Sequence, residues 1–187
     1  MAISVTENMP RMSESWLSIR VELVSGNGHR FWPRPGRILL ASPRHTFAQL
    51  ADTIDTAFGR WDRAHLHQFF LDDGHVIGFP DDEDDAPEDQ LDGAQTMLAR
   101  LKHGEPFVYE FDFGDSWLHL CQPEPDSSDP EDIFGLIPVS PAPCWGWGEL
   151  PDQYGRRWSD DDGTGPQPDD PEGTDLPAIG PWQHHRS

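Results

Sequence analysis

FVYEFDFGDSWLHLCQ is the sequence of residues 107–122, and it predicts a β-hairpin. Aromatic side chains alternate with other residues over 107–113, and a second alternating run covers 116–122. Period-two alternation of this kind is typical of strands that bury one face. A Gly-Asp pair lies between the two runs, and both residue types favour a turn. We therefore expect a hairpin with Phe111 in the core.

The residues before this hairpin predict two more strands and a helix. Residues 16–24 alternate between apolar and polar side chains, and residues 37–41 are largely apolar, which indicates two strands. Thr46 is expected to begin a helix, because Gln49 completes a capping box. Gly59 is a natural end for it. The apolar residues between them have helical spacing and should face the core: Phe47, Leu50, Ile54, Ala57 and Phe58.

Further elements are predicted between that helix and the first hairpin. Residues 65–71 and 75–79 flank an Asp-Asp-Gly sequence, which favours a tight turn between two short strands. Residues 90–102 are predicted to form a second helix that ends at Gly104. The resulting order predicts an α+β fold, a two-layer ββαββαββ sheet with helices packed on one face.

The two ends of the chain differ in composition from the middle. Residues 1–14 are polar and predict a flexible N-terminus, whereas residues 15–158 hold every predicted strand and helix. Residues 159–187 have too few apolar groups to offset the entropy lost on folding, so we expect an acidic, disordered tail. Before it, an irregular C-terminal extension is expected. Its residues 144–158 contain three tryptophans, and we expect them to fold back over an edge or a face of the sheet.

The charge balance argues against one class of partner. The 187 residues include 34 acids and 13 bases, which gives a formal net charge of −21. Binding to nucleic-acid phosphates is driven by counterion release and needs clustered lysine and arginine. Nucleic acid is therefore not an expected partner of this chain alone.

Other features of the composition bear on location. The sequence has no apolar run long enough to span a membrane, and its polar start lacks the features of a signal peptide. The two cysteines, Cys121 and Cys144, form neither a metal motif nor a disulfide framework, which fits a reducing compartment. We expect a cytoplasmic protein without a membrane partner.

Two stretches of the sequence resemble a known family. They are HLHQF at residues 65–69 and YEFDFGDSWLH at residues 109–119. Together with GRWD at residues 59–62, they resemble the plasmid pRiA4b ORF-three-like family, whose members are often labelled as TnpR-like passenger proteins of insertion sequences, a type of mobile element. The resemblance covers residues 15–158 and implies a compact α+β fold without an established activity. Residues 150–155 read LPDQYG where the family usually has a cysteine-bearing motif, so no cysteine pair is expected there.

Three histidines and an aspartate are candidate ligands for a divalent metal. His65 and His67 share one face of a predicted strand, and so do Asp115 and His119. If the two strands are neighbours, these side chains would converge in a group that suits a transition metal or general acid–base chemistry. Alternatively, the histidines are packing residues, and Asp112 and Asp115 cap their own turn. The second interpretation is favoured, because spacing on a strand is a weaker signal than a helical HExxH motif.

Four aromatic residues near the C-terminus are a candidate interaction surface. They are consistent either with docking a partner or with a lid over the sheet: Trp145, Trp147, Tyr154 and Trp158. The acidic residues 81–85 lack the alternating ligands of a calcium loop and predict a solvated loop. The sequence has no phosphate-binding glycine loop, nucleophile elbow or dinucleotide fingerprint, so it identifies no catalytic residue.

These observations leave three hypotheses for function. The leading one is a non-enzymatic accessory or interaction domain, which binds a protein or small ligand through its sheet face and Trp-rich segment. The alternative is a metal-binding domain or metal-dependent enzyme that uses the His/Asp group. The last is a role in DNA recombination, after the TnpR-like label. It is disfavoured because Ser116 lies in an acidic neighbourhood and no basic DNA-binding region accompanies it.

Overall fold

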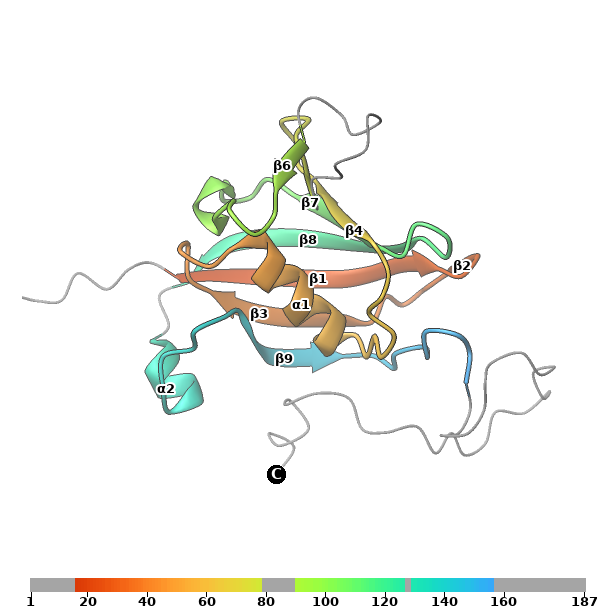
Figure 1. The fold of residues 1–187 in the computed structure, drawn as a ribbon. Helices are drawn as coiled ribbons and strands as arrows, with labels where there is room; N and C mark the ends of the chain where they lie inside the picture. The colour runs from red at the N-terminus through yellow and green to blue at the C-terminus, as the bar shows by residue number, and fades with distance from the viewer. Residues whose placement is uncertain (1–15, 79–89, 127–128, 157–187) are drawn as a thin grey trace, which may run out of the picture.

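The computed structural model describes residues 16–78, 90–126 and 129–156. The predicted N-terminus, the acidic residues 81–85 and the predicted tail lie outside these ranges. One nine-stranded sheet forms the frame of the described part (Figure 1). Its elements follow in chain order: β1 (Trp16–Gly26), β2 (His29–Arg30), β3 (Gly36–Ala41), α1 (Phe47–Ala57), β4 (His67–Phe70), β5 (Val76–Gly78), β6 (Gln90–Asp92), the 3-10 turn η1 (Leu98–Arg100), β7 (Phe107–Phe111), β8 (Trp117–Asp126), α2 (Pro130–Phe134) and β9 (Ala142–Trp147).

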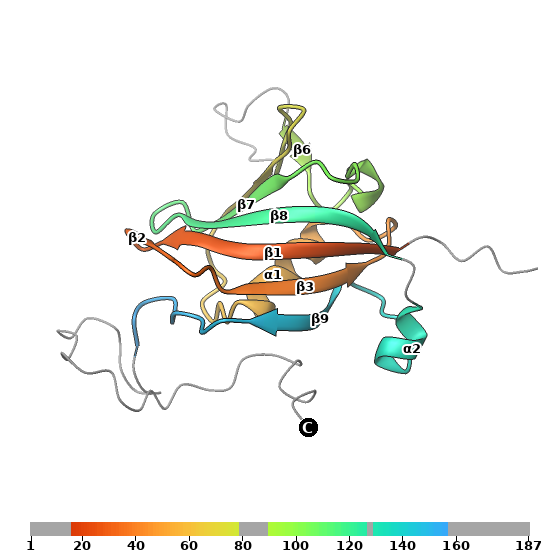
Figure 2. The same cartoon turned by 180° about the vertical axis from the view of Figure 1, so that it is seen from behind.

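The order of strands across the sheet is β6-β5-β4-β7-β8-β1-β3-β9, and the short β2 pairs with β1. Neighbouring strands are antiparallel, except that β5 and β6 are parallel. Helix α1 lies across one face of the sheet (Figure 1). In the opposite view, no helix of the described residues crosses the other face (Figure 2). The α+β class is confirmed, and the sheet dominates the fold.

The strand registers place one row of side chains under α1. Leu23 on β1 is opposite His119 on β8, which is opposite Tyr109 on β7, which is opposite Phe69 on β4. All four side chains are buried. Directly opposite residues on an antiparallel pair point to the same face, so this row runs through the core.

Helix α1 forms as its local sequence predicts. The Thr46 side chain accepts from the backbone N–H of Gln49, and the Gln49 side chain accepts from the backbone N–H of Thr46. This reciprocal capping box satisfies two donors that a helix start leaves unpaired. The chain leaves the helix at Gly59, whose φ of 70° suits glycine. Ile54 is fully buried, as predicted.

The predicted second helix over residues 90–102 is wrong, and the ββαββαββ order is not confirmed. Residues Gln90–Asp92 form strand β6, and only Leu98–Arg100 are helical, as a 3-10 turn. Asp92 ends the strand, because its side chain accepts from Ala94 N at 2.7 Å and favours a local turn. Gly93 then donates to Gly78 O and accepts from Ala48 N, both at 2.9 Å. These tertiary bonds replace the helical ladder.

Both predicted hairpins are confirmed. Strands β4 and β5 pair around the Asp-Asp-Gly turn, and β7 pairs with β8 from Phe107↔Cys121 to Phe111↔Trp117. The β7–β8 turn requires positive φ at Asp112 (58°) and Ser116 (49°). Aspartate tolerates this region better than most residues.

The Trp-rich segment extends the edge of the sheet. Strand β9 pairs with β3 in antiparallel register, so these residues fold back over a sheet edge as predicted. Gly36 allows the approach, because a Cβ placed there would lie 2.1 Å from the Trp147 ring.

Within the described residues, every helix is too short or too polar to span a membrane.

Replacing Phe111 by alanine is expected to lower the free energy of unfolding by about 3–5 kcal/mol, because removing a large buried ring leaves a cavity in the core. Phe113→Ala is the matched control, since Phe113 is two residues away and 47% exposed. It should cost less than about 1 kcal/mol. Urea unfolding of both variants measures the difference, and equal losses would contradict the assigned strand orientation.

Candidate functional site

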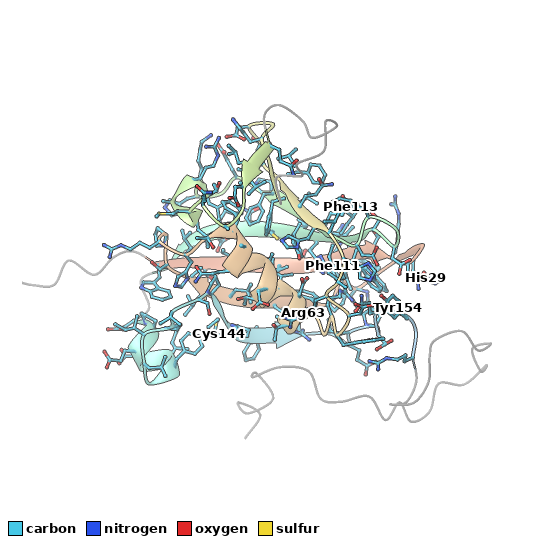
Figure 3. All side chains as sticks on the ribbon, viewed as in Figure 1. His29, Arg63, Phe111, Phe113, Cys144 and Tyr154 are labelled. Carbon is cyan, nitrogen blue, oxygen red and sulfur yellow. The ribbon has the colours of Figure 1, made fainter. Side chains whose placement is uncertain are left out.

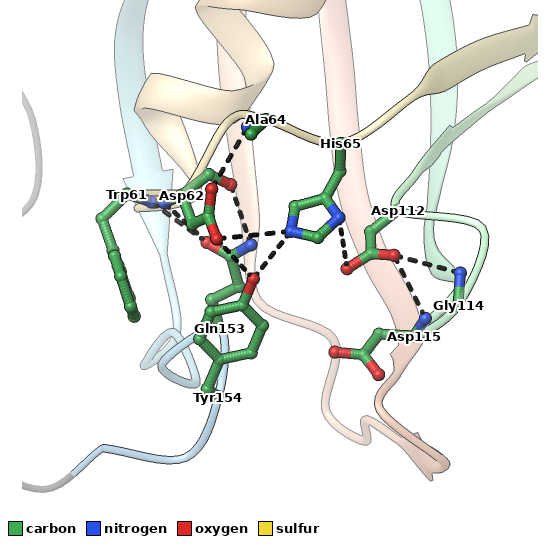
Figure 4. Close-up of polar contacts among 9 residues, drawn as sticks. All are labelled: Trp61, Asp62, Ala64, His65, Asp112, Gly114, Asp115, Gln153 and Tyr154. Carbon is green, nitrogen blue, oxygen red and sulfur yellow. Dashed lines mark hydrogen bonds and ion pairs between the residues drawn. The ribbon is translucent and has the colours of Figure 1, made fainter. Parts of the chain in front are cut away.

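Three loops meet at one end of the sheet, around the imidazole of His65. They are residues 60–66 after α1, residues 112–116 between β7 and β8, and residues 150–156 after β9 (Figure 4). The view with all side chains places Tyr154, Phe111 and Phe113 at this same end (Figure 3). We call this group of loops the loop end.

His65 contacts polar groups on both of its ring nitrogens. Nε2 lies 2.7 Å from the Tyr154 hydroxyl and 3.4 Å from the Asp62 carboxylate, and Nδ1 lies 3.4 Å from the Asp112 carboxylate. The Tyr154 hydroxyl donates its one proton to Asp62 at 2.9 Å. His65 must therefore donate from Nε2 if that contact is to be a hydrogen bond.

Asp112 also stabilises the turn that follows it. Its Oδ1 accepts from the backbone N–H groups of Gly114 at 3.0 Å and Asp115 at 3.4 Å. The interpretation that this aspartate caps its own turn is confirmed. Its other carboxylate oxygen faces His65, so one side chain both shapes the turn and joins it to the loop after α1.

The segment after β9 is fastened to the loop after α1 by Gln153, which is fully buried. Its Oε1 accepts from the backbone N–H groups of Trp61 at 3.2 Å and Asp62 at 3.1 Å, and its Nε2 donates to Asp62 O at 2.9 Å. Beside it, the Trp61 indole donates to Asp152 at 3.1 Å. The Arg156 guanidinium covers the Trp61 ring at 3.9 Å and also binds Asp152. Sequence reasoning missed these contacts, because nothing in LPDQYG indicates a partner so far back in the chain.

The electrostatics of the loop end keep the tyrosine protonated. Burial, reinforced by the hydrogen bond to Asp62, raises the pKa of Tyr154 to about 12. The pKa of Asp62 is lowered, mainly because its carboxylate accepts from Ala64 N and then from Tyr154. Tyr154 is thus a proton donor at neutral pH rather than a phenolate nucleophile.

Two of the other predicted metal ligands, His67 and His119, lie outside the loop end. His67 lies beside Tyr109, with ring centroids 5.8 Å apart, and burial lowers its pKa. His119 is fully buried between Phe58 at 4.7 Å and Tyr109 at 5.5 Å, and burial holds its pKa well below the usual range.

Asp115 contributes its backbone carbonyl, which accepts from Asn27 N at 2.7 Å. In the described part of the chain, no group of three or more His, Cys, Asp or Glu side chains is arranged to hold a metal ion. A divalent metal bound by the predicted set stays a prediction.

A second polar group lies inside the core. The Tyr109 hydroxyl donates to the Asp55 carboxyl at 2.8 Å, and both side chains are buried. Burial raises the pKa of Asp55 from 3.8 to about 7. Arg60 is 2% exposed, and burial lowers its pKa to about 10, so it remains a cation at neutral pH. No pattern in the sequence predicted this group, because Asp55 and Arg60 occupy ordinary positions at the end of a helix.

The four aromatic residues predicted as an interaction surface occupy different places. Trp147 is half-buried, donates to Arg34 O at 2.9 Å and is covered by Arg20 at 4.8 Å. Trp145 is 66% exposed. Tyr154 belongs to the loop end, and Trp158 lies outside the described residues.

Trp145 belongs instead to a concentration of exposed apolar residues. Eleven large apolar side chains are exposed in the described residues, and five of them lie between residues 133 and 145. We call these five the apolar strip; they lie in α2, in the segment that follows it and in β9, the last strand of the sheet (Figure 1). Its members are Ile133, Leu136, Ile137, Val139 and Trp145.

Comparison with known proteins identifies a family and a similar fold. A protein-family model described as plasmid pRiA4b ORF-3-like protein matches residues 17–136. Among solved structures, the crystal structure of MM3350, a protein of unknown function from Methanosarcina mazei Go1, is similar with a TM-score of 0.53 and 19% identity over 71% of this chain and 69% of that chain. An identity this low shows the shared fold alone. No curated protein matches the chain.

Replacing Asp55 by asparagine is expected to flatten the dependence of stability on pH. Because burial raises the folded-state pKa of Asp55 from 3.8 to about 7, its favourable contribution is full below about pH 4 and is lost as the pH rises through about 7. Asparagine does not titrate and still accepts from Tyr109. At about pH 8, Asp55→Asn should be more stable than the natural protein by up to about 4 kcal/mol, at about 1.36 kcal/mol per pKa unit.

Urea unfolding at several pH values measures this effect. Asp52→Asn is the matched control, because Asp52 lies on the same helix with a side chain that is 71% exposed. Its stability should follow the pH dependence of the natural protein. Parallel curves for the natural protein and Asp55→Asn would contradict the assignment.

Proposed function

The chain belongs to the plasmid pRiA4b ORF-3-like protein family, and we propose that this member is a binding domain that holds a partner protein through its apolar strip. The observation that carries the proposal is the concentration of five of the eleven exposed large apolar side chains between residues 133 and 145. Single exposed apolar residues need no explanation, whereas a concentration of them is typical of an interaction surface.

The backbone under the strip is held in place, which supports a preformed surface. Gln49 Nε2 donates to Val139 O at 3.1 Å, and the Thr53 hydroxyl donates to Pro141 O at 2.9 Å. Both donors are on α1, so the helix fixes the segment while the Val139 side chain remains 88% exposed. A surface ordered before binding loses less entropy when a partner docks.

The edge strand favours recognition by side chains over the addition of a partner strand. Strand β9 is at the end of the sheet, where its outer edge would otherwise attract another strand. Pro143 has no N–H to donate, and the β3–β9 register shifts between Ile38 and Leu39. Both features weaken edge pairing.

The charges near the strip indicate the chemistry of the partner. Asp129, Glu131 and Asp132 are exposed on and before α2, and the whole chain has a net charge of −21. A second copy of this chain would be repelled at short range. A partner with an apolar contact surface bordered by lysine and arginine would complement both the apolar side chains of the strip and the negative charge around it.

A short amphipathic helical peptide of leucine and lysine is a suitable probe of the strip. The charge-neutral variant Leu136→Ser/Ile137→Ser/Val139→Ser is expected to bind it about tenfold more weakly, a loss of about 1.4 kcal/mol. The loss follows from the apolar contact area removed, because the attraction between opposite charges is unchanged. Fluorescence anisotropy of the labelled peptide measures both affinities.

The matched control is Trp32→Ser, which removes an 86% exposed aromatic residue outside the strip. It should bind the peptide with the affinity of the natural protein. If the triple variant also binds like the natural protein, the strip is not the docking surface. A leucine and glutamate peptide of the same pattern should bind to neither protein, because of its charge.

A role in DNA recombination is not part of this proposal, because a net charge of −21 opposes binding to phosphate. The full chain is expected to leave duplex DNA unshifted in a gel at micromolar protein and about 0.15 M salt, where charges are screened beyond about 8 Å. A shift that persists at that salt concentration would support the recombination hypothesis instead.

A further inference from the structure

Buried nitrogen atoms without hydrogen-bond partners are concentrated at one place in the core. Seven such side-chain atoms occur in the described residues, and six belong to Arg60, Trp117 and His119. The seventh, Nδ1 of His75, lies 2.9 Å from the Asp73 carboxylate. Buried polar groups are nearly always hydrogen-bonded, so a cluster of exceptions calls for a physical explanation.

The three residues form one layer against the sheet. Trp117 and His119 alternate on β8 and are buried on the same face. The guanidinium carbon of Arg60 lies 3.8 Å from the centroid of the Trp117 ring. Gly26 lies against the same ring, where a Cβ would be 2.0 Å from it. This close packing fixes the indole, and the indole supports the guanidinium.

The cluster contains many more donors than acceptors. A guanidinium has five N–H groups and an indole has one. The imidazole of His119 adds little to this set, because its ring interacts with the backbone of Tyr109 and Trp117. A water molecule that accepted from these groups would still need acceptors for its own two protons. An anion only accepts, so it matches this set of groups better than water does.

The positive charge of Arg60 also favours an anion over water at this place. Burying a guanidinium without a partner costs several kcal/mol. Three carboxyl groups act on Arg60, and Asp55 has the largest effect, followed by Asp152 and Asp112. Asp55 is engaged by the Tyr109 hydroxyl, and burial raises its pKa to about 7. Near neutral pH this carboxyl is therefore ionised in only part of the molecules, and it compensates Arg60 incompletely.

We propose that Arg60 and Trp117, beside His119, bind a small inorganic anion, of the size of chloride, inside the core. Arg60 supplies the charge and a fork of donors, and the Trp117 N–H adds a neutral donor. The three side chains are 2%, 1% and 0% exposed, so the site is closed to solvent. This site is separate from the apolar strip, and its existence does not depend on the proposed function.

Thermal unfolding of the full chain in chloride and in methanesulfonate, at equal ionic strength, tests the proposal. An anion that binds only the folded state stabilises it, and a tenfold excess over Kd raises the folding equilibrium constant about elevenfold. The Tm of the natural protein should rise with chloride. Arg60→Met removes the charge and the donors, and should abolish the difference between the two salts.

Trp117→Phe is a second variant, which keeps a ring under the guanidinium but lacks the N–H. It should retain a reduced response to chloride, and it serves as the test if Arg60→Met does not fold. Crystals of the natural protein grown in bromide give a direct readout. An anomalous peak within hydrogen-bond distance of Arg60 and Trp117 supports the site. Density for water alone at that place, or equal Tm values in both salts, overturns it.

Discussion

The antiparallel pairing of β8 with both β1 and β7 is the interaction on which the rest of the structure depends. On one side β8 pairs with β1 from Trp16↔Asp126 to Ser25↔Leu118, and on the other it pairs with β7 over Phe107–Phe111. Strands β3 and β9 are joined to β8 only through β1, and β4, β5 and β6 only through β7. This double pairing sets which face holds His119, and it therefore decides what α1 covers.

The core beneath α1 contains three polar side chains that the formation of its helix and strands does not require. It holds a carboxyl at Asp55, a cation at Arg60 and an imidazole at His119, all with less than one tenth of their surface exposed. The Tyr109 hydroxyl satisfies Asp55, and the Trp117 ring supports Arg60. Each contact offsets part of a desolvation cost that an apolar residue would not have. The core thus combines a stabilising apolar layer with polar groups, one of which, Asp55, has a pKa raised to about 7.

The segment after α2 creates both surfaces of interest. Its first part presents the apolar strip and ends in β9, which extends the sheet beyond the region matched by the family model. Its last part reaches the loop end, where Gln153 and Tyr154 bind the loop after α1. Helix α1 holds the backbone of the strip, while its side chains stay exposed. At the loop end the polar side chains already bind one another, which favours the strip as the place for a partner.

The sequence by itself determined the elements whose signals are local. These signals involve residues close in the chain, so they can be predicted from the sequence. They are the alternation of β1, the capping box of Thr46 and Gln49, and both hairpin turns. Residues 90–102 were mispredicted because Gly93 bonds to Gly78 and Ala48, which no local pattern contains. The same limit applies to the site. Alternation predicted His65 and His67 on one face of a strand, but β4 begins only at His67, so His65 lies in the loop before it. The return of residues 150–156 brings Tyr154 to His65, and the pairing of strands brings Tyr109 beside His67 and His119. Only tertiary structure decides such contacts, because side-chain period is a property of one strand, whereas convergence is a property of several.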